Sequence, residues 1–285
     1  MEMTEQQTFG SEAISTPAIG GPKKFSFGEN WARFVEFVDD TRIKAAEDSL
    51  IFYLGDINGK KFLDIGSGSG LFSLAARRLG AQVRSFDFDP RSVACTQELK
   101  RRHRPADSDW TIEQGDVLKR DYLMSLGQFD VVYSWGVLHV TGDMWKAIGN
   151  AARLVKPEGL FYIALNNDQG GASRRWMWIK RTYNNSGPLI KWLLVFASGA
   201  YFEGSRMLVA LRDRRNPFKR PERERGMLFK TDLVDWVGGW PFEVATPDAV
   251  FEFCKSRGFS LEKLKTCYGL GCNEFVFKNR SSADR

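Results

Sequence analysis

The chain has 285 residues, a length that predicts one large domain or one domain with an insertion. An apolar fraction of 43% and a charged fraction of 27% exclude a wholly disordered or fibrous protein. Lysine and arginine outnumber aspartate and glutamate by 41 to 35, and residues 168–230 alone hold fourteen of the former and five of the latter. The rest of the chain is mildly acidic, which argues against a protein that coats nucleic acid with its whole surface.

Targeting and membrane-spanning patterns are not found in the sequence. The first twenty residues contain Glu2, Glu5 and Glu12 and no apolar core, so no signal peptide is expected. The longest charge-free apolar run, Trp192–Phe202, has eleven residues, whereas a bilayer-spanning helix needs about twenty. The four cysteines show no CxxC pairing, which argues against a disulfide scaffold. A cytoplasmic protein is therefore expected.

Two segments precede the first expected strand. Residues 1–24 are polar and lack periodicity, so a disordered tail is expected there. In residues 25–59 the apolar side chains of Trp31, Phe34 and Val38 recur at helical spacing. This spacing predicts N-terminal cap helices that precede the main sheet.

Residues 60–166 alternate short apolar runs with helical stretches. The runs expected to form buried strands are Lys61–Ile65, Gln82–Phe86, Trp110–Gln114, Phe129–Ser134 and Leu160–Leu165. The helices expected between them are Leu71–Leu79, Pro90–Arg102, Tyr122–Leu126 and Gly142–Leu154. Alternation of this kind predicts an α/β fold, in which helices cover both faces of a mostly parallel sheet.

Residues 242–285 are expected to complete the same sheet. Thr246–Arg257 is typical of a helix, with Thr246 as its N-cap and proline in the first turn. The runs Leu261–Cys267 and Asn273–Phe277 predict an antiparallel hairpin, which brings the expected number of strands to seven.

Residues 167–241 do not fit the alternation, and they hold the basic excess and five of the nine tryptophans. Because they follow the carboxyl end of a strand, where open α/β sheets bind ligands, they are expected to form a lid insertion. An apolar stripe at helical spacing runs through it: Leu189, Trp192, Leu193, Phe196 and Ala200. The stripe predicts either a helix buried on the sheet domain or an amphipathic face for a hydrophobic acceptor or an anionic membrane.

Three glycines at alternate positions follow the first strand, in the sequence Asp64-Ile65-Gly66-Ser67-Gly68-Ser69-Gly70. Glycines let the backbone approach a ligand closely, and the next helix presents free N–H groups at its first turn. A dinucleotide fingerprint would need a glycine at Leu71 or Ser73, and a Walker loop would need a lysine. Asp64 is instead placed to pair with a cationic group that lies over the loop.

This pattern of one acid and three glycines resembles motif I of the class I S-adenosylmethionine (SAM)-dependent methyltransferases. Four further features follow in the order found in that family: Asp87 after the second strand, Asp116-Val117 after the third, Trp135–His139 after the fourth and Leu154–Leu160 before the fifth. In the last of these, Glu158 stands where the family commonly has glycine. The resemblance implies a Rossmann-like seven-stranded sheet, SAM as cofactor and S-adenosylhomocysteine (SAH) as product.

The resemblance also implies roles for individual residues. Asp87 would bind the ribose hydroxyls, because a carboxylate can accept from both O–H donors. Phe88 would lie against the adenine face, and Asp116 and Val117 would hold the adenine edge. The residues expected around the cofactor are Asp64, Gly66, Ser67, Gly68, Gly70, Asp87, Phe88, Asp116, Val117 and Ser134.

The acceptor side is less specific. His139 follows the fourth strand on the ligand side of the sheet and is a candidate general base, with a structural or substrate-orienting role as the alternative. The residues expected to contact the acceptor are Trp31, Asn166, Arg174 and Arg175. Quinone-pathway relatives carry metal-binding acids around the motif that corresponds to residues 136–140, but this chain has none there, so no metal is expected.

Together these patterns predict a methyltransferase that acts on a small organic acceptor, at the hydroxyl oxygen of an aromatic, hydrophobic or sugar-type natural product. Two alternatives stay open: an RNA or protein methyltransferase that uses the basic insertion, and a catalytically silent SAM-fold binding subunit. Nucleic acid is not the expected partner, and peripheral membrane contact through the lid insertion is a further possibility. The oligomeric state is left open by the sequence.

Overall fold

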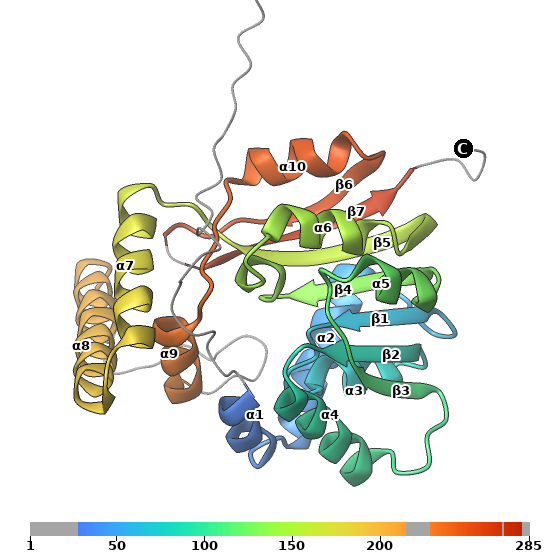
Figure 1. The fold of residues 1–285 in the computed structure, drawn as a ribbon, viewed down its shortest axis with the longest axis horizontal. Helices are drawn as coiled ribbons and strands as arrows, with labels where there is room; N and C mark the ends of the chain where they lie inside the picture. The colour runs from blue at the N-terminus through green and yellow to red at the C-terminus, as the bar shows by residue number, and fades with distance from the viewer. Residues whose placement is uncertain (1–27, 215–228, 270, 281–285) are drawn as a thin grey trace, which may run out of the picture.

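The structure, a computed structural model, describes residues 28–214, 229–269 and 271–280. A seven-stranded sheet lies at its centre (Figure 1), in the order β3-β2-β1-β4-β5-β7-β6. The strands are β1 Lys61–Ile65, β2 Gln82–Asp87, β3 Trp110–Gln114, β4 Phe129–Trp135, β5 Val155–Asn166, β6 Phe259–Lys265 and β7 Cys272–Asn279. Strands β1 to β5 pair in parallel, and β7 is antiparallel to β5 and β6. The predicted sheet and C-terminal hairpin are confirmed; the predicted tail, residues 1–24, lies outside the described residues.

Helices cover both faces of the sheet. They are α1 Gly28–Val35, α2 Asp40–Leu54, α3 Leu71–Arg78, α4 Pro90–His103, α5 Arg120–Leu126, α6 Met144–Ala152 and α10 Pro247–Lys255, with a short 3₁₀ helix at Leu138–Val140. Side chains from α1–α4, such as Phe34 and Leu50, share one apolar core with β1 and β4. Side chains from α5, α6 and α10, such as Ile148 and Val250, share the second core on the opposite face. These two cores hold the strand ends in fixed positions.

The strand order places the carboxyl ends of β1 and β4 side by side at the point where the chain reverses direction across the sheet. Loops from two neighbouring parallel strands diverge at such a point and leave a crevice for a ligand. Both the glycine loop and the segment that contains His139 begin here.

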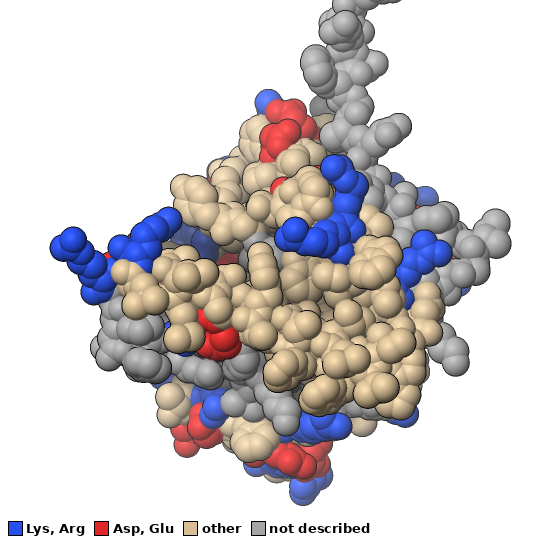
Figure 2. All heavy atoms as spheres, turned by 90° about the vertical axis from the view of Figure 1, so that its left-hand side faces the viewer, with Lys and Arg blue, Asp and Glu red and all other residues tan. Residues whose placement is uncertain are grey.

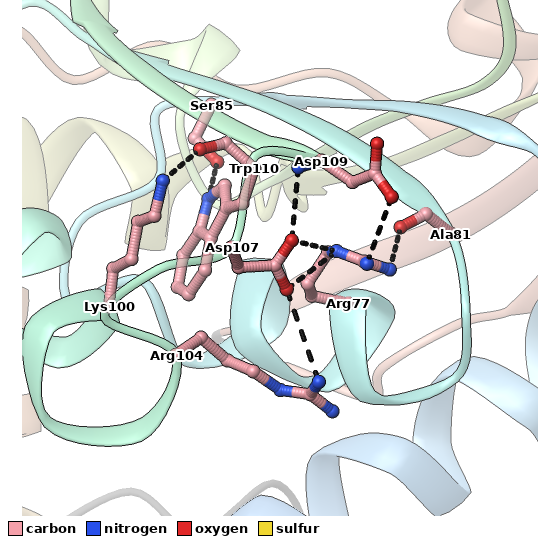
Figure 3. A network of polar contacts seen from close by, with 8 residues as sticks. All are labelled: Arg77, Ala81, Ser85, Lys100, Arg104, Asp107, Asp109 and Trp110. Atoms are coloured by element: carbon pink, nitrogen blue, oxygen red, sulfur yellow. Dashed lines mark hydrogen bonds and ion pairs between the residues drawn. The ribbon is translucent and has the colours of Figure 1, made fainter.

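A polar network fixes the β2–β3 edge of the sheet (Figure 3). The Arg77 guanidinium on α3 lies 2.9 Å from the Asp107 carboxylate and donates to the Ala81 carbonyl at 2.8 Å. The Trp110 indole N–H donates to the Ser85 hydroxyl at 2.9 Å. The network joins the C-terminal end of α3 to the amino ends of β2 and β3, at the end of the strands opposite the glycine loop.

Strand β5 begins earlier than the apolar pattern predicts, at Val155 rather than Leu160. Within it, Glu158 adopts a left-handed conformation with φ of 62°. Glycine adopts this conformation without steric cost, which is a physical reason for the glycine that the family resemblance leads us to expect at this position. The Glu158 carboxylate lies 2.8 Å from Lys278 and 3.0 Å from Arg280, so this residue also links β5 to β7 and its C-terminal end.

The described residues of the lid insertion form three helices, α7 Gly171–Asn185, α8 Pro188–Arg212 and α9 Phe229–Gly238, which lie to the left of the sheet in Figure 1. They pack around a third apolar cluster that contains Trp176, Val237 and Phe242. One side of α8 contributes Leu194, Val195 and Phe202 to that cluster.

The apolar stripe predicted from the sequence lies on the opposite side of α8. Leu189 is 71% exposed, Trp192 61% and Phe196 65%. The interpretation that this stripe is buried on the sheet domain is therefore wrong, because α7 and α9 already occupy the inner side of the helix. Within the described part of the chain, no helix combines the length and apolar character needed to cross a bilayer.

Candidate active site

The glycine loop between β1 and α3 passes through left-handed conformations, with φ of 77° at Gly66, 55° at Gly68 and 82° at Gly70. Only glycine adopts such values freely, and the loop depends on them to turn from strand to helix within five residues. The N–H groups of Gly66 and Ser67 donate to the Phe86 carbonyl at 2.8 and 3.2 Å. These bonds hold the loop against the end of β2.

Asp87, the last residue of β2, faces this loop. Its Oδ2 accepts a hydrogen bond from the Gly68 N–H at 3.0 Å, and its Oδ1 accepts one from the Asp89 N–H at 2.9 Å. Each carboxylate oxygen therefore keeps a free lone pair, which suits a pair of vicinal hydroxyls. Burial raises the pKa of Asp87 to about 6. Hydrogen bonds from a ligand to the carboxylate would stabilise the ionised form of Asp87.

Asp64 is held by a chain of buried hydroxyls. The Ser73 hydroxyl donates to Asp64 Oδ2 at 2.5 Å, the Ser73 and Ser85 hydroxyls are 2.7 Å apart, and the Trp110 indole N–H donates to Ser85. All four side chains are 2% exposed or less. If the Ser85 hydroxyl donates to Ser73 and the Ser73 hydroxyl donates to Asp64, every donor in this row of side chains has an acceptor. The row then fixes the carboxylate beside the glycine loop.

Asp116 and Val117 follow β3 at the same edge. The Asp116 side chain accepts from the Leu118 N–H at 2.8 Å, which forms a tight turn and keeps the carboxylate at the cavity. Val117 is 6% exposed and packs into the core. Phe88 is 56% exposed at the cavity rim, where an apolar ligand face would cover it.

One cavity of about 700 Å³ runs from the glycine loop to the lid insertion. The predicted site residues that line it are Trp31, Asp64, Gly66, Ser67, Gly68, Asp87, Phe88, Asp116, Val117, His139 and Asn166. Four predicted residues do not line it. Gly70 starts α3 against Thr96, and the Ser134 hydroxyl donates to the Ile65 carbonyl. Arg174 and Arg175 are exposed on α7.

Trp31 of α1 lies over the glycine loop. A Cβ atom at Gly68 would come within 2.9 Å of its indole ring. Trp31, which the sequence predicts as an acceptor contact, therefore lies at the glycine-loop end of the cavity, where its ring covers the loop.

His139 is 4% exposed, and its Nδ1 accepts a hydrogen bond from the Asn166 N–H at 3.3 Å. This bond places the proton of the neutral ring on Nε2. Burial, with the charge of Lys180 acting in the same direction, lowers the pKa of His139 to about 3. The imidazole is therefore neutral near pH 7, and its low basicity favours an orienting role over that of a general base.

The sequence prediction missed the residues that form the lid side of the cavity: Lys180, Trp236, Gly239, Trp240, Phe242, Gly271 and Cys272. A signal for Lys180 exists in the sequence. Ser173, Trp176, Lys180 and Tyr183 follow one another at helical spacing, and all four are buried. A lysine at helical spacing from buried aromatic residues is a candidate for a buried, functional side chain.

Comparison with known proteins agrees with this geometry. A family model described as a methyltransferase domain matches residues 63–163. These residues are a class I methyltransferase domain. The methyltransferase domain thus spans β1 to β5 and contains the glycine loop, Asp87, Asp116 and His139. The expected methyltransferase family is confirmed for these residues.

Among curated relatives, ubiquinone biosynthesis O-methyltransferase of Rhodopseudomonas palustris is 29% identical over 142 residues, which cover 49% of this chain and 51% of that protein. Human glycine N-methyltransferase is 28% identical over 174 residues, which cover 56% of this chain and 59% of that protein. The matches thus span about half the length of these relatives, and they include both O- and N-methyltransferases.

Solved structures share the fold at low sequence identity. Magnesium protoporphyrin IX methyltransferase of Synechocystis, with bound SAH, superposes with a TM-score of 0.52 at 15% identity, over 89% of this chain and 95% of that one. The N-methyltransferase NodS of Bradyrhizobium japonicum, in complex with SAH, gives 0.52 at 14% identity, over 90% and 100%. These structures support the seven-stranded methyltransferase architecture.

Proposed function

We propose that this chain transfers the methyl group of SAM to a hydroxyl oxygen of a small organic acceptor. The observation that carries the proposal is the single cavity, which joins a carboxylate-lined loop region to an aromatic region under the lid insertion. The first region fits a cationic nucleoside and the second fits an apolar acceptor, so both reactants can lie in one enclosure.

Three carboxylates would bind the cofactor, each at a different part. Asp64 would accept from the α-ammonium group, and Asp87 from the two ribose hydroxyls, through the lone pairs that its backbone partners leave free. Asp116 would accept from the adenine amino group, with the Val117 N–H beside it. SAM supplies a methyl group already activated on a sulfonium, so the protein mainly has to orient the two reactants and exclude water.

His139 would orient the acceptor rather than remove its proton. Its Nδ1 accepts from the Asn166 N–H, and a backbone hydrogen bond with Ala164 also acts on the ring, so the neighbouring strand β5 fixes the orientation of the imidazole. The Asn166 side chain itself accepts from the Cys272 thiol at 3.6 Å, which ties the end of β5 to β7. Both residues would then shape the space in which the acceptor hydroxyl lies.

The test is a pair of measurements on the full chain. Titration calorimetry should show that SAH binds, and SAM labelled in its methyl group should transfer the label to hydroxylated aromatic compounds in a small-molecule fraction. SAH binding without transfer to any compound would favour a silent binding subunit, and transfer to RNA or protein would favour the other alternative. Absence of SAH binding would overturn the proposal.

We further propose that the outward face of α8 contacts an anionic membrane surface. Figure 2 shows this side of the molecule as a broad uncharged area with lysine and arginine side chains at its rim. The large exposed apolar residues of α8 include Leu189, Ile190, Trp192, Leu193, Phe196, Tyr201, Leu208 and Leu211, and Trp178 of α7 is exposed as well. Contiguous apolar surface of this extent is uncommon on a face that meets only water.

Charge favours lipid over a second copy of the chain. Apart from the buried Lys180, the sequences of α7 and α8 together hold six lysines and arginines against one acid, Glu203, whose carboxylate lies 2.8 Å from Arg206. Two copies that met through this face would bring the same positive rims together. An anionic bilayer would instead attract them, while the tryptophan and phenylalanine rings enter the headgroup region.

Flotation with lipid vesicles tests the contact. The protein should float with phosphatidylcholine vesicles that contain phosphatidylserine, and the double variant W192E/F196E should not. Met124→Glu, which changes a 60% exposed side chain on α5, is the matched control and should float like the unchanged protein. Failure to float at low salt, or dimers that depend on Trp192, would contradict the proposal.

A further inference from the structure

The two halves of the cavity differ in charge. The half beside the glycine loop carries the carboxylates of Asp64, Asp87 and Asp116. The half under the lid insertion is formed by aromatic side chains, the hairpin residues Gly271 and Cys272, and Lys180. Among the described residues that line this second half, Lys180 alone carries a formal charge at neutral pH, since His139 is neutral there.

Lys180 reaches this position from the buried face of α7, with 2% of its surface exposed. Its Nζ donates to the Trp236 carbonyl on α9. The same atom lies 4.6 Å from the centroid of the Trp236 ring and 4.7 Å from that of Phe242. Ring faces attract an ammonium group electrostatically, so the cavity wall holds the cation at a fixed place among apolar surfaces.

An anion that enters this half of the cavity meets a cation that has already lost most of its water. The attraction between two charges is several times stronger in such surroundings than at a protein surface, and hydrogen bonds between charged partners are the shorter and stronger kind. His139 lies in the same cavity, where burial and then the charge of Lys180 lower the pKa of its imidazole.

Building on the proposed methyl transfer, we infer that Lys180 recognises a carboxylate on the acceptor. The acceptor is then an aromatic hydroxy acid: its ring lies among Trp236, Trp240 and Phe242, its carboxylate meets Lys180, and its hydroxyl points toward the cofactor. A single lysine matches a carboxylate, which carries one charge, better than a phosphate with nearly two.

A purely structural role for Lys180 makes a different prediction. Its bond to the Trp236 carbonyl joins α7 to α9, and loss of that bond would loosen the lid insertion. Charged and neutral acceptors would then lose affinity to the same degree. Only carboxylate recognition makes the effect of substitution depend on the charge of the acceptor.

The experiment compares caffeate with its methyl ester, in which one added methyl group removes the charge of the carboxyl group. Binding to the SAH-loaded protein is followed by quenching of tryptophan fluorescence, in the unchanged chain and in Lys180→Met and Lys180→Arg. The unchanged protein should bind the acid about tenfold more tightly than the ester. Lys180→Met should lose that preference, and Lys180→Arg should retain most of it.

Three results would overturn the inference: equal binding of acid and ester by the unchanged protein, binding of neither at millimolar concentration, or an acid preference that survives in Lys180→Met. SAH affinity, measured in each variant, separates this inference from the proposed function. Normal SAH binding without an acid preference removes the role of Lys180 alone, whereas absence of SAH binding in the unchanged chain removes the proposed function. If Lys180→Met does not fold, Lys180→Arg and the comparison of the two compounds still decide.

Discussion

Replacement of Asp87 by alanine is expected to weaken SAH affinity about a hundredfold. The carboxylate would accept hydrogen bonds from two ribose hydroxyls, and their loss corresponds to about 3 kcal/mol. Titration calorimetry measures the affinity directly. Thermal unfolding of the unliganded variant is the control, since Asp87 also accepts from the N–H groups of Gly68 and Asp89. Affinity within threefold of the unchanged chain, in a folded variant, would refute the ribose role.

The same carboxylate provides a second readout, through pH. Since burial raises the pKa of Asp87 to about 6, acidification protonates the group in the free protein and removes an acceptor. SAH affinity should fall about tenfold from about pH 7 to about pH 5, and Asp87→Asn should abolish this dependence. The effect on stability has the opposite sign: because the folded-state pKa is raised, the unliganded protein loses stability as the pH rises from about 4 to about 6.

Gly66→Ala is expected to weaken SAH binding and activity about a hundredfold. A Cβ atom at Gly66 would lie 2.5 Å from both methyl groups of Val137, and the φ of 77° is already unfavourable for alanine. Val137 is β-branched and stiff, so the glycine loop itself must move. A shift of about 1 Å in a loop that positions a reactant costs about a hundredfold in activity.

Gly127→Ala is the matched control for this substitution. Gly127 has the same φ of 77°, at the end of α5, but no atom lies within 4 Å of a Cβ built there. This variant should lose about 1–3 kcal/mol of stability, because φ of 77° with ψ of −157° is a conformation that glycine alone adopts readily, and it should keep its SAH affinity. If both variants bind SAH equally well, the steric explanation for Gly66 is wrong, since the two glycines share a φ of 77° and only a Cβ atom at Gly66 meets another side chain.

Much of the fold was predictable because its signals are local. Apolar runs of four to six residues and helical spacing repeat along residues 60–166, and each depends only on near neighbours in the chain. The glycine loop was equally visible, since left-handed backbone conformations require glycine at fixed positions. Boundaries were less certain: β5 begins at Val155 because main-chain pairing with β4 extends beyond its apolar core.

The acceptor side was predicted less well, because it is formed by residues from distant segments. Arg174 and Arg175 were chosen for their charge, but the phase of α7 turns them to the solvent and turns Lys180 inward. The support of Asp64 by Ser73, Ser85 and Trp110 joins three segments that no spacing rule connects. The exposure of Trp192 and Phe196 likewise depends on α7 and α9, which cover only the other side of α8.

The amino-acid order by itself determined the sheet, the bend after its first strand and the acids that follow successive strands. Periodicity and the conformational preference of glycine act over a few residues, so both can be recognised in the sequence without knowledge of the rest of the chain. Packing alone decided which cation enters the cavity, which side of the longest helix faces the solvent and how the buried acid beside the loop is supported. Those outcomes depend on which surfaces of remote helices meet, and burial free energy is a property of the assembled surfaces rather than of any short stretch.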